Sequence, residues 1–196
     1  MNPIARINGW PFDFSRRILS RQAESKTSAV MNEAVRDMTA PAQAISTRPE
    51  VVHFVQAMLD SYHHWIGVDL IERIGSPIEQ STRLFMAPFV VAAHATQSDP
   101  ILCYGNQTAL ELWQMDFTTF TQTPSRLTAE AVHRDERAEL LETTRRDGHI
   151  RNYRGIRIAS TGRRFRIENV IVWNVLDDAG HRLGQAATFA EWVFLD

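Results

Sequence analysis

The side chains best suited to chemistry are the seven histidines and the single cysteine, Cys103. Metal binding needs ligands at a spacing that brings them to one place, and the adjacent His63 and His64 point in different directions on a helix. No His-Glu-x-x-His pattern or comparable ligand set occurs. Because a lone cysteine can form neither an internal disulfide nor a Cys-x-x-Cys pair, we expect no metal centre and no internal disulfide.

The sequence also lacks the arrangements that are typical of enzymes. It contains no Ser-His-Asp order, nucleophile elbow, P-loop or Gly-x-Gly-x-x-Gly loop, and its carboxylates form no recognisable acid–base pair. Cys103 lies in a short apolar strand pattern, where a buried and inert thiol is common; the alternative is a redox or photoactive thiol. We therefore expect a protein without catalytic residues.

Eight arginines fall between positions 145 and 166, where Asp147 is the only acid. A basic stripe attracts nucleic acid, and Tyr153 could stack on a base. The same pattern is typical of a solvated sheet face beside a helix C-terminus, with glutamates nearby. Because the net charge is -2 and the pI is near 6.4, we favour the solvated face and expect no nucleic-acid partner.

The chain divides into an irregular beginning and a periodic remainder. Residues 1–47 hold no apolar period longer than about two turns, which predicts a disordered extension. Apolar residues at spacings of three and four then predict a helix over 51–66, ending at Gly67. Ser76 and Glu79 form a capping box that starts a second helix, ending before Pro88. Residues 48–87 are thus a helical N-terminal cap.

Residues 88–196 combine short strand patterns with short helices. Asn106 and Asp116 are good helix N-caps, and Gly148 suits a helix C-terminus. Two strands followed by helices and a three-strand meander favour an α+β domain, with one antiparallel sheet and helices on one face. The strands are predicted at 89–95, 101–104, 149–160, 163–176 and 181–195, and the helices at 107–115, 116–120 and 132–147.

The dipeptide Thr-Gly at 161–162 predicts a two-residue hairpin turn between two of these strands. That turn pairs Ile158 with Phe165 on an apolar face. It also pairs Arg157 with Arg166 on a polar outer face, which is the alternation that an antiparallel pair should have.

Several segments in this order resemble the MEKHLA domain, a PAS-like module, over residues 50–195. They are APFVV (87–91), DPI (99–101), YGN (104–106), PSRL (124–127), GRRFRIEN (162–169), VWN (172–174) and GQAATF (184–189). The resemblance implies a PAS-like five-stranded antiparallel sheet with helices on one face, preceded by two N-terminal helices. It implies a sensory or interaction module. In plants the domain ends homeodomain–leucine-zipper regulators, but these 196 residues resemble no homeodomain, so DNA binding does not carry over.

The resemblance leaves the cofactor unknown. Flavin-binding light sensors of the PAS class carry a cysteine on a helix after the position of Asn106, and residues 124–127 contain none. His133 begins a loop-to-helix segment where haem-binding PAS members can place a ligand. The alternative for His133 is ordinary chemistry of a helix N-terminus, with the following acids favoured by the helix dipole.

We expect a ligand cavity between the sheet and its helices, lined by His94, Tyr104, Asn106, Trp173 and Gln185. Such a site would be mostly apolar with a few convergent polar groups. Strand parity places Trp173 with Phe165, unless a bulge near Asn169 turns it outward. If Trp173 and Gln185 point to opposite faces, or if a cavity touches fewer than three of the five, the chain is better described as a surface-interaction module.

The sequence thus predicts a non-catalytic sensory, ligand-binding or protein-interaction module. The alternatives are a small enzyme using the same cavity, and a scaffold that acts through its surface alone. Surplus apolar residues on the helix over 51–66 predict a homodimer through that helix. No apolar run approaches the ~20 residues that a membrane helix needs, and no signal-like segment opens the chain, so we expect a cytoplasmic protein.

Overall fold

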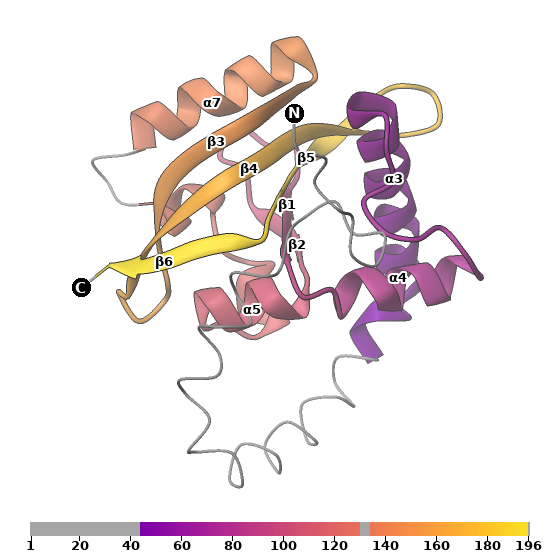
Figure 1. Cartoon of the computed structure of the whole chain (residues 1–196), viewed down its shortest axis with the longest axis horizontal. Coiled ribbons are helices and arrows are strands. Elements are labelled where there is room, and N and C mark those ends of the chain that lie inside the picture. The colour runs from indigo at the N-terminus through magenta and orange to yellow at the C-terminus, as the bar shows by residue number, and fades with distance from the viewer. Residues whose placement is uncertain (1–43, 130–133, 196) are drawn as a thin grey trace, which may run out of the picture.

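The computed structural model describes residues 44–129 and 134–195, with side chains from 139 in the second range (Figure 1). Among these residues no helix has the length and apolarity needed to cross a bilayer. The elements are α3 (Pro49–Ile66), α4 (Pro77–Phe85), β1 (Val90–His94), β2 (Leu102–Gly105), α5 (Gln107–Trp113), α6 (Phe117–Phe120), the 3-10 helix η2 (Ser125–Thr128), α7 (Arg134–Asp147), β3 (His149–Ile158), β4 (Arg164–Leu176), β5 (Arg182–Phe189) and β6 (Glu191–Leu195).

One antiparallel sheet forms the centre of the fold, with strand order β2-β1-β5-β4-β3. β6 extends the pairing of β5 along β4, with Thr188 opposite Ile171 and Glu191 opposite Glu168. The predicted α+β class and the predicted antiparallel sheet are therefore confirmed. The sheet has six strands among the described residues rather than the predicted five, because the strand predicted over 181–195 divides into β5 and β6. Strands far apart in sequence become neighbours because β1 pairs with β5.

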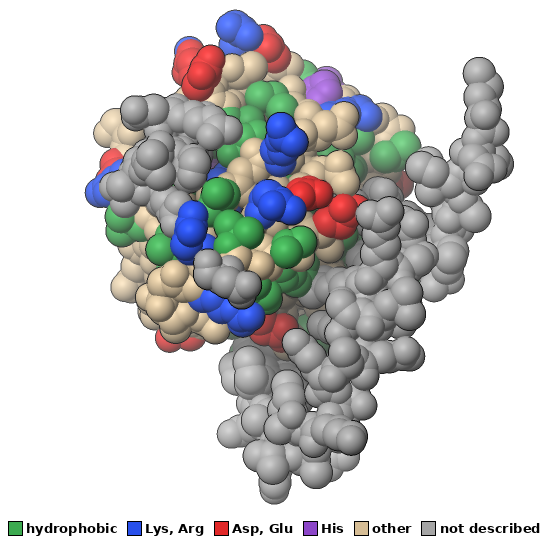
Figure 2. Space-filling view, turned by 60° about the vertical axis from the view of Figure 1, so that its left-hand side comes forward, with side chains coloured by type: hydrophobic (Ala, Val, Ile, Leu, Met, Phe, Trp, Pro, Cys, Tyr) green, Lys and Arg blue, Asp and Glu red, His purple; other side chains and the backbone are tan. Residues whose placement is uncertain are grey.

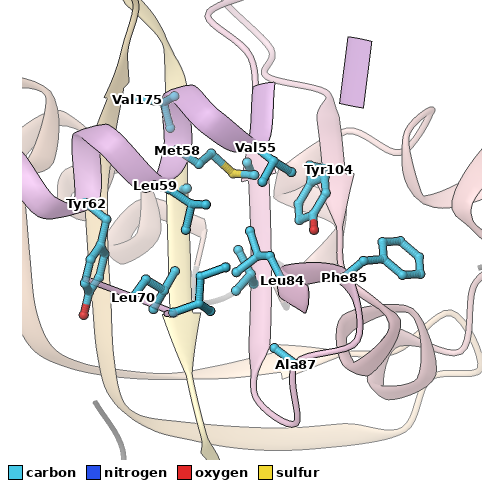
Figure 3. Packing of buried hydrophobic residues seen from close by; sticks show 14 of the residues in the cluster. Val55, Met58, Leu59, Tyr62, Leu70, Leu84, Phe85, Ala87, Tyr104 and Val175 are labelled. Atoms are coloured by element: carbon cyan, nitrogen blue, oxygen red, sulfur yellow. The ribbon is translucent and has the colours of Figure 1, made fainter. Parts of the chain in front are cut away.

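Helices cover both faces of this sheet. On one face α3 and α4 pack on the strands and form what we call the first core cluster, which includes Met58, Leu84, Tyr104 and Trp173. Figure 3 shows Val55, Met58 and Leu59 on the side of α3 that faces the strands. On the other face residues of α5, α6 and α7 form the second core cluster. The single helical face expected for the core holds for α5–α7, while the N-terminal helices cover the opposite face.

The predicted capping box of α4 and the predicted glycine end of α3 are both present. Ser76 accepts a bond from the Glu79 amide while the Glu79 carboxylate accepts from the Ser76 amide, and α3 ends at Gly67 with φ of 81°. The capping box and the left-handed glycine both give hydrogen-bond partners to backbone groups that a helix terminus would otherwise leave unpaired.

The packed structure begins before the predicted boundary at residue 48. Ser46 is fully buried, its carbonyl accepts from Ser81 Oγ at 2.7 Å, and Ile45 packs against the first core cluster. Phe54, part of the surplus apolar surface on α3, packs against the same cluster. The surface that motivated the dimer prediction is thus partly used inside the chain. Residues 1–43 of the predicted extension lie outside the described residues.

The β3–β4 hairpin differs from its predicted register by one residue. Ala159 donates its amide to the Arg163 carbonyl at 2.9 Å, and the loop between them has three residues, ending at Gly162 with φ of 85°. A three-residue loop with a left-handed glycine replaces the predicted two-residue turn. Because side chains alternate along a strand, the shift pairs Arg157 with Phe165 and moves Arg157 from the polar outer face to the inner face.

Two asparagines with positive φ interrupt the β3–β4 ladder. Asn152 in β3 has φ of 59° and Asn169 in β4 has φ of 53°, and each lies at a shift in the pairing register. Ile150 pairs with Val172, whereas Tyr153 pairs with Val170, so each strand gains one residue in turn. Such bulges change which face the following side chains occupy.

Gly184 marks the closest approach of β5 to β1. A Cβ added there would lie 2.1 Å from the carbonyl oxygen of His94. We predict that Gly184→Ala forces the strands apart and lowers the free energy of unfolding by about 3 kcal/mol. Urea unfolding followed by tryptophan fluorescence measures this change, and an unaltered midpoint would contradict the close approach.

Candidate functional site

A cavity of about 70 Å³ lies between the sheet and the helices of the second core cluster. Its wall is mostly apolar and includes Leu102, Trp113, Phe120, Leu140 and Phe189. Polar side chains from four elements complete the lining, namely His94, Thr128, Tyr153, Arg157 and Gln185. A mainly apolar hollow with a few convergent polar groups has the character of a small-molecule site, although its volume is well below the ~300 Å³ of sites for larger ligands.

The structure separates the five residues that were predicted to line one cavity. His94 and Gln185 do line it, and they pair with each other across β1 and β5. Tyr104, Asn106 and Trp173 are absent from its lining. The single five-residue pocket is therefore wrong, and on that ground alone a surface-interaction module would be the better description.

Trp173 and Tyr104 belong to the opposite face of the sheet. The bulge at Asn169 turns Trp173 away from the side of Phe165, which is the exception that the parity argument allowed. Trp173 is fully buried, donates Nε1 to the Met58 carbonyl at 3.2 Å, and meets Tyr62 edge-on at 5.1 Å between ring centroids. Tyr104 lies in the same first core cluster, where burial raises its pKa above the ordinary value.

Asn106 is a structural hub rather than a ligand contact. Its Oδ1 accepts from the Ala109 amide, which caps α5, and from the Val91 amide at 2.9 Å. Its Nδ2 donates to the Phe89 carbonyl at 2.7 Å, with the Ala87 and Leu84 carbonyls at 3.3 and 3.4 Å. This fully buried side chain thereby joins the end of α4, the start of β1 and the start of α5.

Gln185 connects the cavity to the C-terminal half of α7. Its Nε2 donates to the Leu141 carbonyl at 2.9 Å and to Asn174 Oδ1 at 3.0 Å. Asn174 Nδ2 in turn donates to the Thr144 carbonyl at 2.9 Å. Two buried amides therefore hold α7 on the sheet beside the cavity, and any change at Gln185 acts directly on this helix.

Arg157 and Tyr153 are site residues that the sequence argument missed. Arg157 is only 7% exposed; its Nη1 donates to the Ile156 carbonyl at 2.8 Å and its Nη2 to Tyr153 Oη at 3.3 Å. The guanidinium carbon lies 5.5 Å from the Tyr153 ring centroid. The pattern Tyr-x-Gly-x-Arg at 153–157 could have revealed the pair, because alternate strand residues share one face and the glycine leaves space between them.

The other candidate groups have ordinary environments. Burial raises the pKa of the Cys103 thiol to about 12, which supports the inert thiol. No group of three potential metal ligands occurs in the part of the chain that the structure describes. His133 lies outside the described residues, so the haem alternative stays open there.

Acidic side chains neutralise part of the arginine-rich stretch. Arg145, Arg146 and Arg166 form ion pairs with Glu142, Asp147 and Glu168, respectively. Figure 2 shows Lys and Arg side chains scattered among hydrophobic ones, with acidic side chains beside them. Three of the eight arginines are thus paired with acids, and the expected absence of a nucleic-acid partner stays a prediction.

The antiparallel sheet and its helices place the chain in the PAS-like class of α+β modules. The crystal structure of a PAS domain from Colwellia psychrerythraea matches with a TM-score of 0.51 at 8% identity, covering 60% of this chain and 94% of that one. A light-oxygen-voltage domain studied with a flavin analogue matches with a TM-score of 0.48 at 12% identity, covering 60% and 85%.

Within this class, the model of the MEKHLA domain matches residues 52–194, and the chain belongs to the MEKHLA domain family. The predicted family is confirmed. The homeobox-leucine zipper protein HOX10 of Oryza sativa, in the indica and japonica subspecies, is 20% identical over 187 residues. That match covers 93% of this chain but 22% of the rice protein, so the chain spans about a fifth of the length of these relatives.

The role of Asn106 can be measured against a simpler helix cap. We predict that Asn106→Ala lowers the free energy of unfolding by about 3 kcal/mol or more, because it leaves several buried backbone groups without partners. Asp116→Ala is the matched control, since Asp116 is an exposed cap that accepts from the Thr119 amide. Asp116→Ala should lower the free energy of unfolding by about 1 kcal/mol. Equal losses of unfolding free energy for the two variants in urea would show that Asn106 acts only as a helix cap.

The raised pKa of Cys103 predicts a slow reaction of this thiol with alkylating reagents. At pH 8 a thiol with a pKa of about 12 is thiolate in roughly one molecule in 10⁴, against about a quarter for an unperturbed thiol. Because the thiolate is the reactive form, alkylation of the folded chain should be about 10³-fold slower than in urea, and should accelerate as the pH rises. Equal rates in the two states, measured by mass spectrometry, would contradict the burial.

Proposed function

We propose that this chain is a sensory module that binds a small molecule in the cavity between the sheet and α5–α7, without catalysing a reaction. The observation that carries the proposal is the cavity itself, into whose wall the fold places a buried cation, Arg157. This cavity differs from the predicted one and shares only His94 and Gln185 with it. The ligand-binding hypothesis therefore rests on these new residues and on the membership of a PAS-like family.

The surroundings of the cavity suit the transmission of a signal. Leu140 and Leu141 of α7 line it, and Gln185 joins the Leu141 carbonyl to the sheet. A ligand that displaced or strengthened this bond would change how firmly α7 is held. Since binding can shift only an equilibrium whose two states it contacts differently, α7 is the element through which occupancy would be read.

The cavity wall supports binding rather than catalysis. Its described residues include no carboxylate and no cysteine that could act with His94 as an acid–base or nucleophilic pair. His94 Nδ1 lies 2.8 Å from the adjacent Ala95 carbonyl oxygen, within hydrogen-bond distance.

We propose a cytoplasmic location, where a lone thiol remains reduced. The homodimer through residues 51–66 stays a prediction.

A second function is favoured by one surface. Val193 and Phe194 of β6 are 52% and 38% exposed, on a strand that pairs with β4 but is not joined to β1. Exposed apolar side chains on an edge strand are typical of pairing surfaces. In that case the chain would be an interaction module and the cavity would be a packing void.

The test compares the cavity with the surface in the full chain. Native mass spectrometry of the purified protein is expected to reveal a bound small molecule, and Ala187→Leu, which fills the cavity wall, should remove it. The matched control is Ala179→Leu in the exposed β4–β5 turn, which should retain it. A chain without any adduct, whose NMR amide shifts also stay unchanged with a set of small fragments, would overturn ligand binding and favour the interaction module.

A further inference from the structure

Arg157 is a buried cation without an acidic partner among the described residues. It is 7% exposed, and none of the ion pairs in the described part of the chain includes it. A guanidinium carries five N–H donors, and two bonds to neutral acceptors are all that these residues supply. Burying a charge without a counter-ion is costly, so an anion bound beside Arg157 would be strongly stabilised.

The fold prepares this cation for a ligand. The hairpin register that pairs Arg157 with Phe165 puts Arg157 on the cavity side of β3, and Tyr153, which has the same strand parity, lies on that side too. A Cβ on Gly155 would lie 2.4 Å from Tyr153 Oη and 3.1 Å from Arg157 Nη1, so the glycine lets the phenol lie over the strand. Tyr153 Oη accepts from Arg157, which leaves the phenol hydrogen to donate to a second acceptor. Two adjacent donors are therefore held in place before a ligand arrives.

The rest of the wall limits the ligand's size and character. Leu102, Phe120, Leu140 and Phe189 offer apolar surface, and a cavity of about 70 Å³ holds roughly five water-sized positions. Trp113 also lines the cavity, and its buried Nε1 has no acceptor among the described residues. A ligand of this size needs an acceptor-rich anionic head and a short apolar body.

We propose that the cavity binds a small monocarboxylate, with its carboxylate on the Arg157 guanidinium and the Tyr153 hydroxyl and its alkyl part against the apolar wall. This inference rests on the proposed function and specifies its ligand class. The planar fork of an arginine matches the two oxygens of a carboxylate, and a charge-assisted pair of this kind is roughly twice as strong as a neutral hydrogen bond.

The test uses the full chain and three probes, namely butyrate, its neutral near-isostere butyramide, and inorganic phosphate. Binding is followed by NMR, with the Trp113 indole resonance as the reporter inside the cavity. Butyrate is expected to bind about tenfold or more tightly than butyramide, because only butyrate forms the charge-assisted pair. Phosphate lacks an apolar body and should bind more weakly than butyrate.

Two variants test whether Arg157 is the cation that binds the carboxylate. Arg157→Gln should weaken butyrate binding by about tenfold or more and leave butyramide binding within twofold. Arg154→Gln is the matched control, since Arg154 is an exposed arginine on the same strand, and it should leave both affinities unchanged. The comparison of butyrate with butyramide in the unaltered chain needs no variant and stands even if Arg157→Gln fails to fold.

The outcomes separate this inference from the function on which it rests. Equal binding of butyrate and butyramide, or an unchanged butyrate affinity in folded Arg157→Gln, would overturn the proposed recognition of a carboxylate. The proposed function of the cavity in binding a small molecule would still stand. If phosphate bound as tightly as butyrate, the proposed contribution of the ligand's alkyl part to binding would be overturned. If none of these probes and no neutral fragment shifts the Trp113 resonance, both the carboxylate and the cavity function fail.

Discussion

The paired bulges at Asn152 and Asn169 decide which side chains meet on each face of the sheet. Each asparagine adopts the left-handed conformation that few other residues tolerate, and each adds one residue to its strand. The first bulge lets Ile150 and Tyr153, which differ in strand parity, both face the second core cluster, and the second bulge sends Trp173 to the opposite face. Without the bulge at Asn169, strand alternation would put Trp173 on the face of Phe165, away from α3.

The two faces of the sheet consequently differ in how completely they are packed. The face under α3 and α4 is closed by large fully buried side chains, among them Tyr62, Tyr104 and Trp173, and Asn106 ties its edge to α5. The face under α5–α7 keeps a cavity in which polar side chains replace part of the packing. In the proposed function the closely packed first face would hold the lining of the second in place, as a binding site requires.

The sequence predicted what local rules control. The capping box at Ser76, the left-handed end at Gly67 and the caps at Asn106 and Asp116 follow from side chains that act within a few residues, and all are present. The α+β class followed from element order, and the family from its motifs.

The failures lie where a distant constraint overrides a local rule. The hairpin register depended on loop geometry that Thr-Gly leaves undecided between two and three residues, and a slip of one residue reversed the face of Arg157. The predicted pocket grouped residues by strand parity, which a bulge changes. Arg157 itself violates the rule that charges stay at the surface, and such violations are expected where a protein accepts a cost in stability to hold a ligand. Arg157, which sequence patterning placed on the outer face, is therefore the residue on which the proposed ligand binding depends most.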